Sequence, residues 1–187
     1  MRRKDDEKQK SIKRAVVKIV LQEGMHGASI SKIAKAAGVS PATVYIYYDN
    51  KDVMLKSIYH EYAEQVFQNL LDKLHEDLPG NEFVDLIIRE YYNFMVTNEE
   101  VYHFVEQFSS CPSLNHGCTV LTGPELLNTR IKAYREAGIF YNYDNSNIWA
   151  MLFYPVKGIA KKSCGIAMTK EQRLDEMIHM IQRSLLQ

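Results

Sequence analysis

The fold is decided by residues 29–55, which read SISKIAKAAGVSPATVYIYYDNKDVML. Helix start and stop signals divide this stretch into two short helices, expected at about Ser31–Ala37 and Ala42–Tyr48. Ser29 is a candidate N-cap of the first helix, because its hydroxyl can accept a hydrogen bond from a free N–H of the first turn. Gly38 suits the left-handed position that follows a helix. The two helices are therefore expected to be joined by a tight turn.

The start of the second helix has its own signal. Ser40-Pro41 fits an N-cap followed by proline at the first helical position, where the missing N–H costs nothing. Residues 44–48, VYIYY, have the propensity of a strand, but the flanking caps and the absence of a partner strand favour a helix. Two short helices joined in this way predict a helix-turn-helix, whose second helix enters the major groove of DNA.

Helical periodicity continues in both directions from this pair. A first helix is expected to end near Gly24, and a long helix begins after Asp49-Asn50 and ends by Pro79-Gly80. Residues 110–123 form the longest expected loop. Because no strand pattern is convincing, the predicted fold is all-α, with about nine helices. The remaining helices are expected at about 81–96, 99–109, 124–137, 145–162 and 169–185.

The last two predicted helices differ in character. Residues 145–162 are apolar on almost every side, which predicts a helix buried all round, in a core or an interface. Residues 169–185 carry a single apolar stripe, formed by Leu174, Met177, Ile178, Ile181 and Leu185.

The net charge of zero conceals a division along the chain. Residues 1–51 hold 11 Lys and Arg against 5 Asp and Glu, a balance of +6, and the remaining residues have a balance of −6. A basic N-terminal quarter on an acidic body suggests that one end meets a polyanion. The alternative is a solvated basic helix without a partner.

Composition excludes several classes of protein. With 46% hydrophobic and 25% charged residues, the chain is not intrinsically disordered. The longest apolar run, Ile148 to Val156, is nine residues, whereas a membrane-spanning helix needs about 20. The charged start lacks a secretory signal, and three cysteines fit reduced thiols better than a disulfide framework. We therefore expect a cytoplasmic protein.

Geometry assigns DNA contacts to the helix-turn-helix. The short side chains of Ala42 and Thr43 allow close approach to base edges, and the Thr43 methyl can touch thymine. Tyr45 and Tyr47 are long enough to reach phosphates, and the N-terminus of the helix after Ser29 offers N–H groups to another phosphate. The residues expected to contact DNA are Ser29, Lys32, Ser40, Pro41, Ala42, Thr43, Tyr45, Tyr47 and Lys51.

Residues 29–55 resemble the N-terminal signature of TetR/AcrR-type transcriptional repressors. The shared pattern is a polar pair, Ile-Ala, Ala-Gly-Val-Ser, a small residue, Thr, an aliphatic residue, Tyr, an aromatic pair and a Lys. The resemblance covers about residues 8–60. Two positions depart from it, since the family often has Gly where this chain has Ala42 and Phe where it has Tyr48. These changes leave the fold and the groove placement intact and affect which bases are read.

The resemblance implies two domains, residues 1–51 for DNA binding and residues 52–187 for ligand binding and dimerisation. It implies a homodimer formed through the last two helices and a pseudo-palindromic double-stranded operator. A small-molecule effector would shift the long helix and release the repressor from DNA. We expect this effector to be largely apolar or aromatic.

Aromatic residues of the second part are candidates to line the effector cavity, with plain core packing as the alternative. Glu90 lies on the apolar arc of its helix, where a charge is costly unless it is paired. It would bind a cationic ligand or be satisfied by an Arg or Tyr of a neighbouring helix. The ligand candidates are Tyr62, Glu90, Tyr91, Phe94, Phe104, Phe108, Trp149 and Phe153.

Signals for metal binding and catalysis are weak. The group His103, Cys111, His116 and Cys118 has suitable ligand types, but its spacings match no standard site, so no metal or other cofactor is expected. The chain has no Gly-rich phosphate loop, no His-Glu-x-x-His and no Gly-x-Ser-x-Gly, and Cys164 has no neighbouring base. We therefore do not expect an enzyme.

Overall fold

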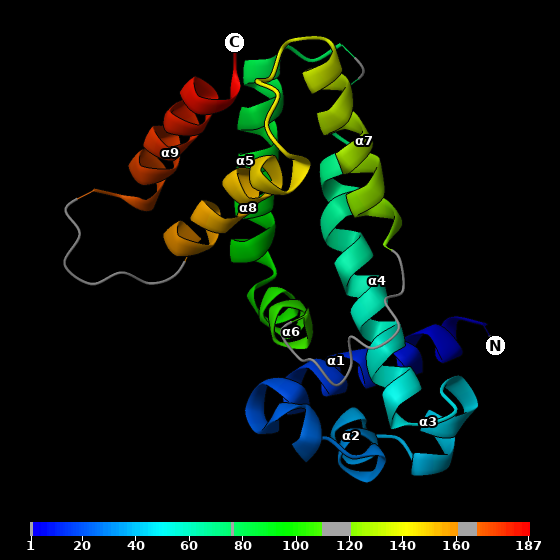
Figure 1. The fold of residues 1–187 in the computed structure, drawn as a ribbon. Coiled ribbons are helices and arrows are strands. Elements are labelled where there is room, and N and C mark those ends of the chain that lie inside the picture. The colour runs from blue at the N-terminus through cyan, green and yellow to red at the C-terminus, as the bar shows by residue number, and fades with distance from the viewer. Residues whose placement is uncertain (1, 76, 110–120, 161–167) are drawn as a thin grey trace. The chain divides into compact units, whose positions relative to one another are not determined.

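The computed structural model describes residues 2–75, 77–109, 121–160 and 168–187, and these are predominantly helical (Figure 1). The all-α prediction is confirmed. Within the described ranges the only extended pairing is an isolated antiparallel bridge between Phe140 and Leu186. The helices are α1 (Arg2–Gly27), α2 (Ile30–Ala37), α3 (Pro41–Tyr47), α4 (Lys51–Leu71), α5 (Gly80–Thr97), α6 (Glu99–Ser109), α7 (Thr122–Glu136), α8 (Asn145–Ala160) and α9 (Lys170–Leu185).

The chain divides into two compact units. Unit 1 comprises Met1–Ala63 and Asn98–Val120, and unit 2 comprises Glu64–Thr97 and Leu121–Gln187. Unit 1 is larger than the DNA-binding domain expected over residues 1–51, because it takes in the first part of α4 and all of α6. The functional boundary at residue 51 stays a prediction.

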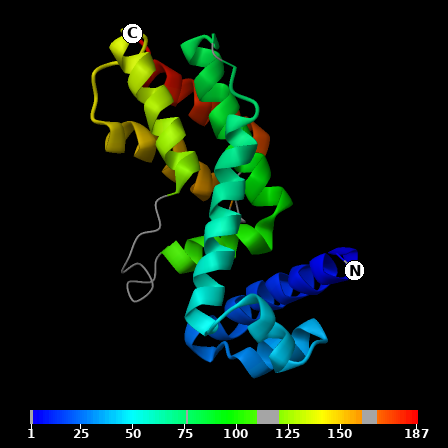
Figure 2. The same cartoon turned by 90° about the vertical axis from the view of Figure 1, so that its right-hand side faces the viewer.

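The core of unit 1 draws on every helix that the unit contains. Tyr59 of α4 stacks on Phe108 of α6 with 4.3 Å between ring centroids, and Tyr62 meets Phe104 edge-on at 6.2 Å. Helices α1 and α6 lie side by side (Figure 2). The helix-turn-helix therefore rests on a core closed by α6. Its fully buried residues include Ile12, Val16, Val20, Ile33, Val44, Met54, Ile58 and Phe104.

Helix α1 contains the break that the sequence predicted near Gly24. This glycine has φ 72° and ψ 171°, which is not helical, and the helix resumes as far as Gly27. The position of the break is confirmed, but the helical segment continues beyond the expected end.

Unit 2 is built around α5, which packs against α8 and α9, while α7 packs against α8. The apolar stripe predicted for α9 is largely buried, with Met177 half-buried at its edge. Among the residues that the structure describes, helix α8 buries one face and leaves Tyr154 64% exposed. Burial all round is therefore wrong for the single chain, since the neighbouring helices cover one side of α8 only. An interface remains the alternative for its exposed side.

Helix α7 begins earlier than the sequence predicted. Thr122 and Gly123 were expected in the loop, but they form the first turn of α7. A carboxylate of α4 provides the cap: Glu64 accepts hydrogen bonds from the backbone N–H of Thr122 at 2.5 Å and of Gly123 at 2.9 Å. This acceptor lies far away in the sequence, so local signals could not reveal it. Residues 110–120 of the expected loop lie outside the described residues.

Among the helices in the described ranges, none combines the length and the apolar character needed to cross a membrane.

Candidate nucleic-acid interface

The helix-turn-helix is held by the local contacts that the sequence predicted. The Ser29 hydroxyl accepts a hydrogen bond from the Lys32 backbone N–H at 3.3 Å, and Ser40 caps α3 by accepting from the Thr43 N–H at 3.2 Å. Gly38 has φ 68° and ψ 31°, the left-handed conformation that closes α2. Pro41 occupies the first turn of α3. These caps fix where each short helix begins and ends.

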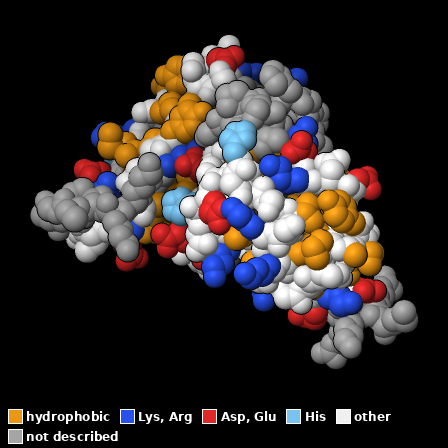
Figure 3. Space-filling view, turned by 90° about the horizontal axis from the view of Figure 1, so that it is seen from below, with side chains coloured by type: hydrophobic (Ala, Val, Ile, Leu, Met, Phe, Trp, Pro, Cys, Tyr) orange, Lys and Arg blue, Asp and Glu red, His pale blue; other side chains and the backbone are white. Residues whose placement is uncertain are grey.

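The orientation of α3 follows from its one buried residue. Val44 is 0% exposed and anchors the helix to the core, whereas Tyr45 is 54% and Ile46 is 77% exposed. Pro41 and Ala42 are also exposed. In the view of the molecule from below, Lys and Arg side chains gather near the centre, and a hydrophobic patch lies beside them (Figure 3). Helix α3 thus presents its outer side to solvent.

Ile46 is an exposed residue of α3 that sequence reasoning did not single out. Residues follow one another by about 100° around an α-helix. Ile46 therefore lies about 200° from Val44, close to the direction opposite the core, and Ala42 lies about 160° away on the other side of that direction. The structure identifies Val44 as the buried anchor. With that residue known, the spacing of about 100° per residue gives the direction of Ile46 from the sequence alone.

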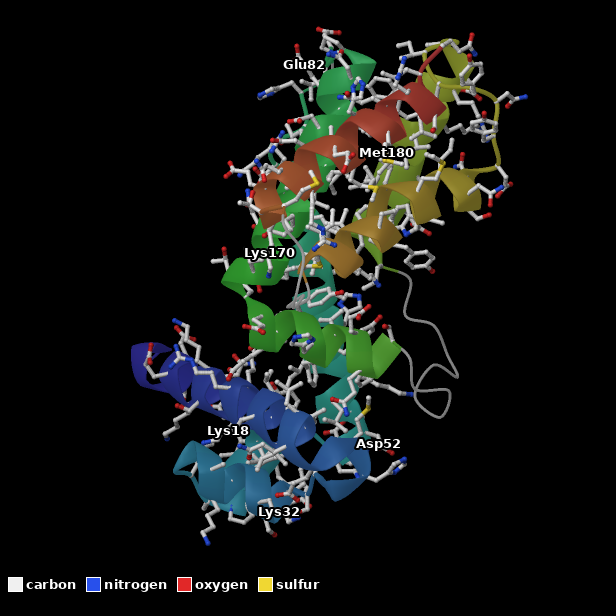
Figure 4. The ribbon with its side chains drawn as sticks, turned by 90° about the vertical axis from the view of Figure 1, so that its left-hand side faces the viewer. Lys18, Lys32, Asp52, Glu82, Lys170 and Met180 are labelled. Carbon is white, nitrogen blue, oxygen red and sulfur yellow. The ribbon has the colours of Figure 1, made fainter. Side chains whose placement is uncertain are left out.

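The basic side chains of unit 1 differ in how they are engaged. Lys32 forms an ion pair with Glu23 and donates to the Gly27 carbonyl at 3.1 Å. In the part of the chain that the structure describes, no ion pair involves Lys18 or Lys51. Figure 4 shows Lys18 on α1 and Lys32 on α2. The positive charge of Lys32 is therefore partly compensated, and its predicted DNA contact would compete with Glu23.

The two predicted phosphate-reaching tyrosines also differ. The Tyr47 hydroxyl donates to the Asp5 carboxylate at 3.2 Å and lies 3.3 Å from the Asp5 carbonyl. Loss of hydration and, after it, the negative charge of Asp5 raise the pKa of Tyr47. Tyr45 is the more exposed of the two. A phosphate contact by Tyr47 stays a prediction, and it would require its hydroxyl to leave Asp5.

The ligand candidates do not form one group. Tyr91, Trp149 and Phe153 come together in unit 2, where Phe153 lies 4.9 Å from Tyr91 and 4.6 Å from Trp149 between ring centroids. Phe67 of α4, which sequence reasoning missed, joins them at 5.7 Å from Trp149. Phe94 is also buried in unit 2. We call Phe67, Tyr91, Trp149 and Phe153 the aromatic cluster.

The other aromatic candidates have a different setting. Tyr62, Phe104 and Phe108 lie in unit 1, in or against the core beneath the helix-turn-helix. Their packing there accounts for their apolar character without a ligand.

Glu90 forms an ion pair with Lys73, with 2.5 Å between Oε2 and Nζ. The partner is a lysine that follows α4 rather than the expected Arg or Tyr. This pair supports the structural interpretation of Glu90. A groove of about 360 Å³ elsewhere in unit 2 is lined by polar and aliphatic residues and includes none of the ligand candidates: Leu78, Asn81, Glu82, Asp85, Leu86 and Gln182.

The predicted metal group is only partly described. His103 is exposed on α6, 3.8 Å from Glu99. Cys111, His116 and Cys118 lie outside the described residues, as does Cys164. Within the described ranges, no three His, Cys, Asp or Glu residues are grouped as metal ligands.

Known proteins resemble this chain in two ways: in the sequence of its N-terminal part and in the fold of nearly the whole chain. Residues 14–58 match the sequence model described as bacterial regulatory proteins, tetR family. The fatty acid metabolism regulator protein of Bacillus subtilis is 31% identical over 81 residues, which are 43% of this chain and 42% of that protein. The negative transcriptional regulator of the biofilm operon icaADBC of Staphylococcus epidermidis is 27% identical over 62% of this chain and 54% of that protein. The chain spans about half the length of the first curated relatives it matches.

Solved structures share the fold over nearly the full chain. A TetR family transcription regulator from Marinobacter aquaeolei has a TM-score of 0.83 at 22% identity and covers 100% of this chain and 99% of its own. The transcriptional regulator FadR from Bacillus subtilis, in complex with stearoyl-CoA, has a TM-score of 0.72 at 21% identity and covers 91% of this chain and 96% of its own. At these identities the likeness concerns the fold alone.

Proposed function

We propose that this chain, whose residues 14–58 match the model of bacterial regulatory proteins of the tetR family, is a ligand-responsive transcriptional repressor of that family. It binds a pseudo-palindromic operator as a homodimer and is released by a small, largely apolar or aromatic effector. The observation that carries the proposal is the capped helix-turn-helix, whose second helix is anchored by Val44 and exposes its opposite side.

The proposed contacts to DNA are of two kinds: contacts to phosphates position the protein, and contacts to base edges read the sequence. The N-terminus of α2, capped by Ser29, offers backbone N–H groups and the positive end of the helix dipole to a phosphate. Lys51, at the start of α4, supplies a positive charge to the backbone, and Tyr45 extends outward from α3. Ala42 and Thr43 approach base edges from the start of α3. Phosphate contacts set affinity and its dependence on salt, whereas the base contacts set sequence preference.

Exposed apolar residues on the last two helices support the dimer. Tyr154 of α8 is 64% exposed and Met180 of α9 is 56% exposed. Figure 4 shows Met180 on the outer side of α9. Burying such side chains against a second copy would remove apolar surface from water. Two copies then present two α3 helices to half-sites spaced by about one helical turn of DNA or a multiple of it.

An apolar effector fits the aromatic cluster better than a charged one. The four rings of the cluster pack closely, and Glu90 already has a cationic partner. One Bacillus subtilis relative is a fatty acid metabolism regulator, and the FadR structure from that organism holds stearoyl-CoA. Because its acyl chain is apolar, a long-chain acyl-CoA is the first compound to test. The acyl chain would require the rings to separate, and the charged coenzyme A part would lie outside the cluster.

Selection from a random DNA library with the full chain, followed by gel shift, tests the proposal. We expect an inverted-repeat sequence, a complex that weakens steeply with salt, and release by stearoyl-CoA or by a compound with a similar apolar chain. Lys51→Ala should weaken binding to all sequences about equally. Lys132→Ala, an exposed lysine of unit 2, is the matched control and should leave DNA binding unchanged. Failure to select any sequence at low salt would contradict a DNA-binding function.

A further inference from the structure

We propose that Ile46 determines part of the operator sequence by packing against the methyl group of a thymine in the major groove. This inference rests on the proposed DNA-binding function and goes beyond it, because it names the chemical group that one residue reads.

The phase of α3 places Ile46 where a base reader must be. Val44 is buried at 0% exposure, and Ile46 at 77% exposure lies nearly opposite to it. A helix that enters the groove with its buried side toward the protein turns the opposite side toward the base edges. Ala42 shares that side and has a short side chain, so it allows the helix to approach closely.

The chemistry of the outer side is almost wholly apolar. Helix α3 reads PATVYIY and contains no Arg, Lys, Asn or Gln, the residues that usually form bidentate bonds with bases. The hydroxyl of Thr43 lies 2.9 Å from that of Ser40, and the hydroxyl of Tyr47 donates to Asp5. Hydrogen-bond readout by α3 is therefore limited. The thymine methyl is the one apolar group that base pairs present in the major groove.

Among the residues of unit 1 that the structure describes, no packing contact accounts for an isoleucine at this position. Because the Ile46 side chain is largely in solvent, it adds little to the core, and β-branched residues are not favoured in helices. In the major groove, contact with a thymine methyl group would remove the Ile46 side chain from water. Contact of this kind provides sequence preference without a charge or a hydrogen bond.

Deoxyuridine provides the direct test, because it differs from thymidine only by the missing methyl. In the operator obtained by selection, each thymidine of one half-site is replaced in turn by deoxyuridine, and affinity is measured with the full chain. One position should lose about four-fold in affinity, the factor that corresponds to one methyl group removed from water. With Ile46→Ala, the loss at that position should vanish, while other positions keep their behaviour.

Val96→Ala is the matched control, because Val96 is also β-branched and is 45% exposed, but on α5 of unit 2. It should keep the full deoxyuridine effect. If no replacement weakens the wild-type complex, or if Ile46→Ala shows the same loss as wild type, the assignment of Ile46 is wrong although DNA binding stands. If the wild-type chain selects no sequence, the proposed function fails, and this inference fails with it.

Discussion

Replacing Gly38 by alanine tests the turn on which the helix-turn-helix depends. Gly38 has φ 68°, and a Cβ built there would meet no other atom within 4 Å. The penalty is therefore the backbone strain of an L-residue in the left-handed region, about 1–2 kcal/mol. For a chain of 187 residues this should lower Tm by about 2–8 °C. Gly38→Asn should lose less, because asparagine tolerates this conformation better.

Gly138 provides a control with the same local geometry. It has φ 71° and equally open surroundings, but it follows α7 in unit 2. Gly138→Ala should therefore lower Tm by a similar amount, measured by circular dichroism, and leave operator affinity unchanged. Gly38→Ala should lower both, because relief of the strain shifts α3 relative to α2. If Gly38→Ala kept wild-type Tm and affinity, or if Gly38→Asn were worse than Gly38→Ala, the reasoning from this turn would be refuted.

Three further predictions concern single side chains. A Cβ at Gly123 would lie 2.4 Å from the side chain of Phe67, so Gly123→Ala should lower the free energy of unfolding by about 1–3 kcal/mol, measured by thermal unfolding. Gly158→Ala is the control: a Cβ there would meet nothing within 4 Å, so this change should be neutral or stabilising. Ser40→Ala removes the N-cap of α3 and should cost about 1 kcal/mol and weaken operator binding in gel shift; an unchanged complex would contradict the role of this cap. Hydrogen bonds from Ser146 lower the pKa of Asp144, so the ionised carboxylate stabilises the fold above the ordinary pKa of 3.8, and this stabilisation is lost as pH falls through the lowered pKa. Asp144→Asn should therefore reduce the loss of stability in acid. Identical dependence of Tm on pH for the two proteins would contradict a stabilising role of these hydrogen bonds.

Features fixed by neighbouring residues could be predicted from the sequence. The ends of α2 and α3 depend on Ser29, Gly38 and Ser40, each within three residues of the group it caps or the helix it ends. The break at Gly24 is local in the same sense. Such signals need no knowledge of the tertiary structure, and they placed the helix-turn-helix correctly.

Features that depend on distant partners could not be predicted. The start of α7 depends on Glu64, which comes more than fifty residues earlier, and the charge of Glu90 is met by Lys73 of another segment. Aromatic residues show the same limit. Tyr91 and Phe104 both lie on the apolar face of a predicted helix, but Phe104 packs in unit 1 while Tyr91 packs in unit 2.

Unit 1 is discontinuous in sequence, and this affects how it can form during synthesis. The helices that would read DNA leave the ribosome before α6, which supplies Phe104 and Phe108 to their core and follows only after the whole of α5 has been made. A nascent or truncated chain ending near residue 60 would have a complete helix-turn-helix with part of its hydrophobic core uncovered. The helix-turn-helix and the core beneath it are thus completed at different times, and a fragment cut at residue 51 would lack the core residues of both α4 and α6.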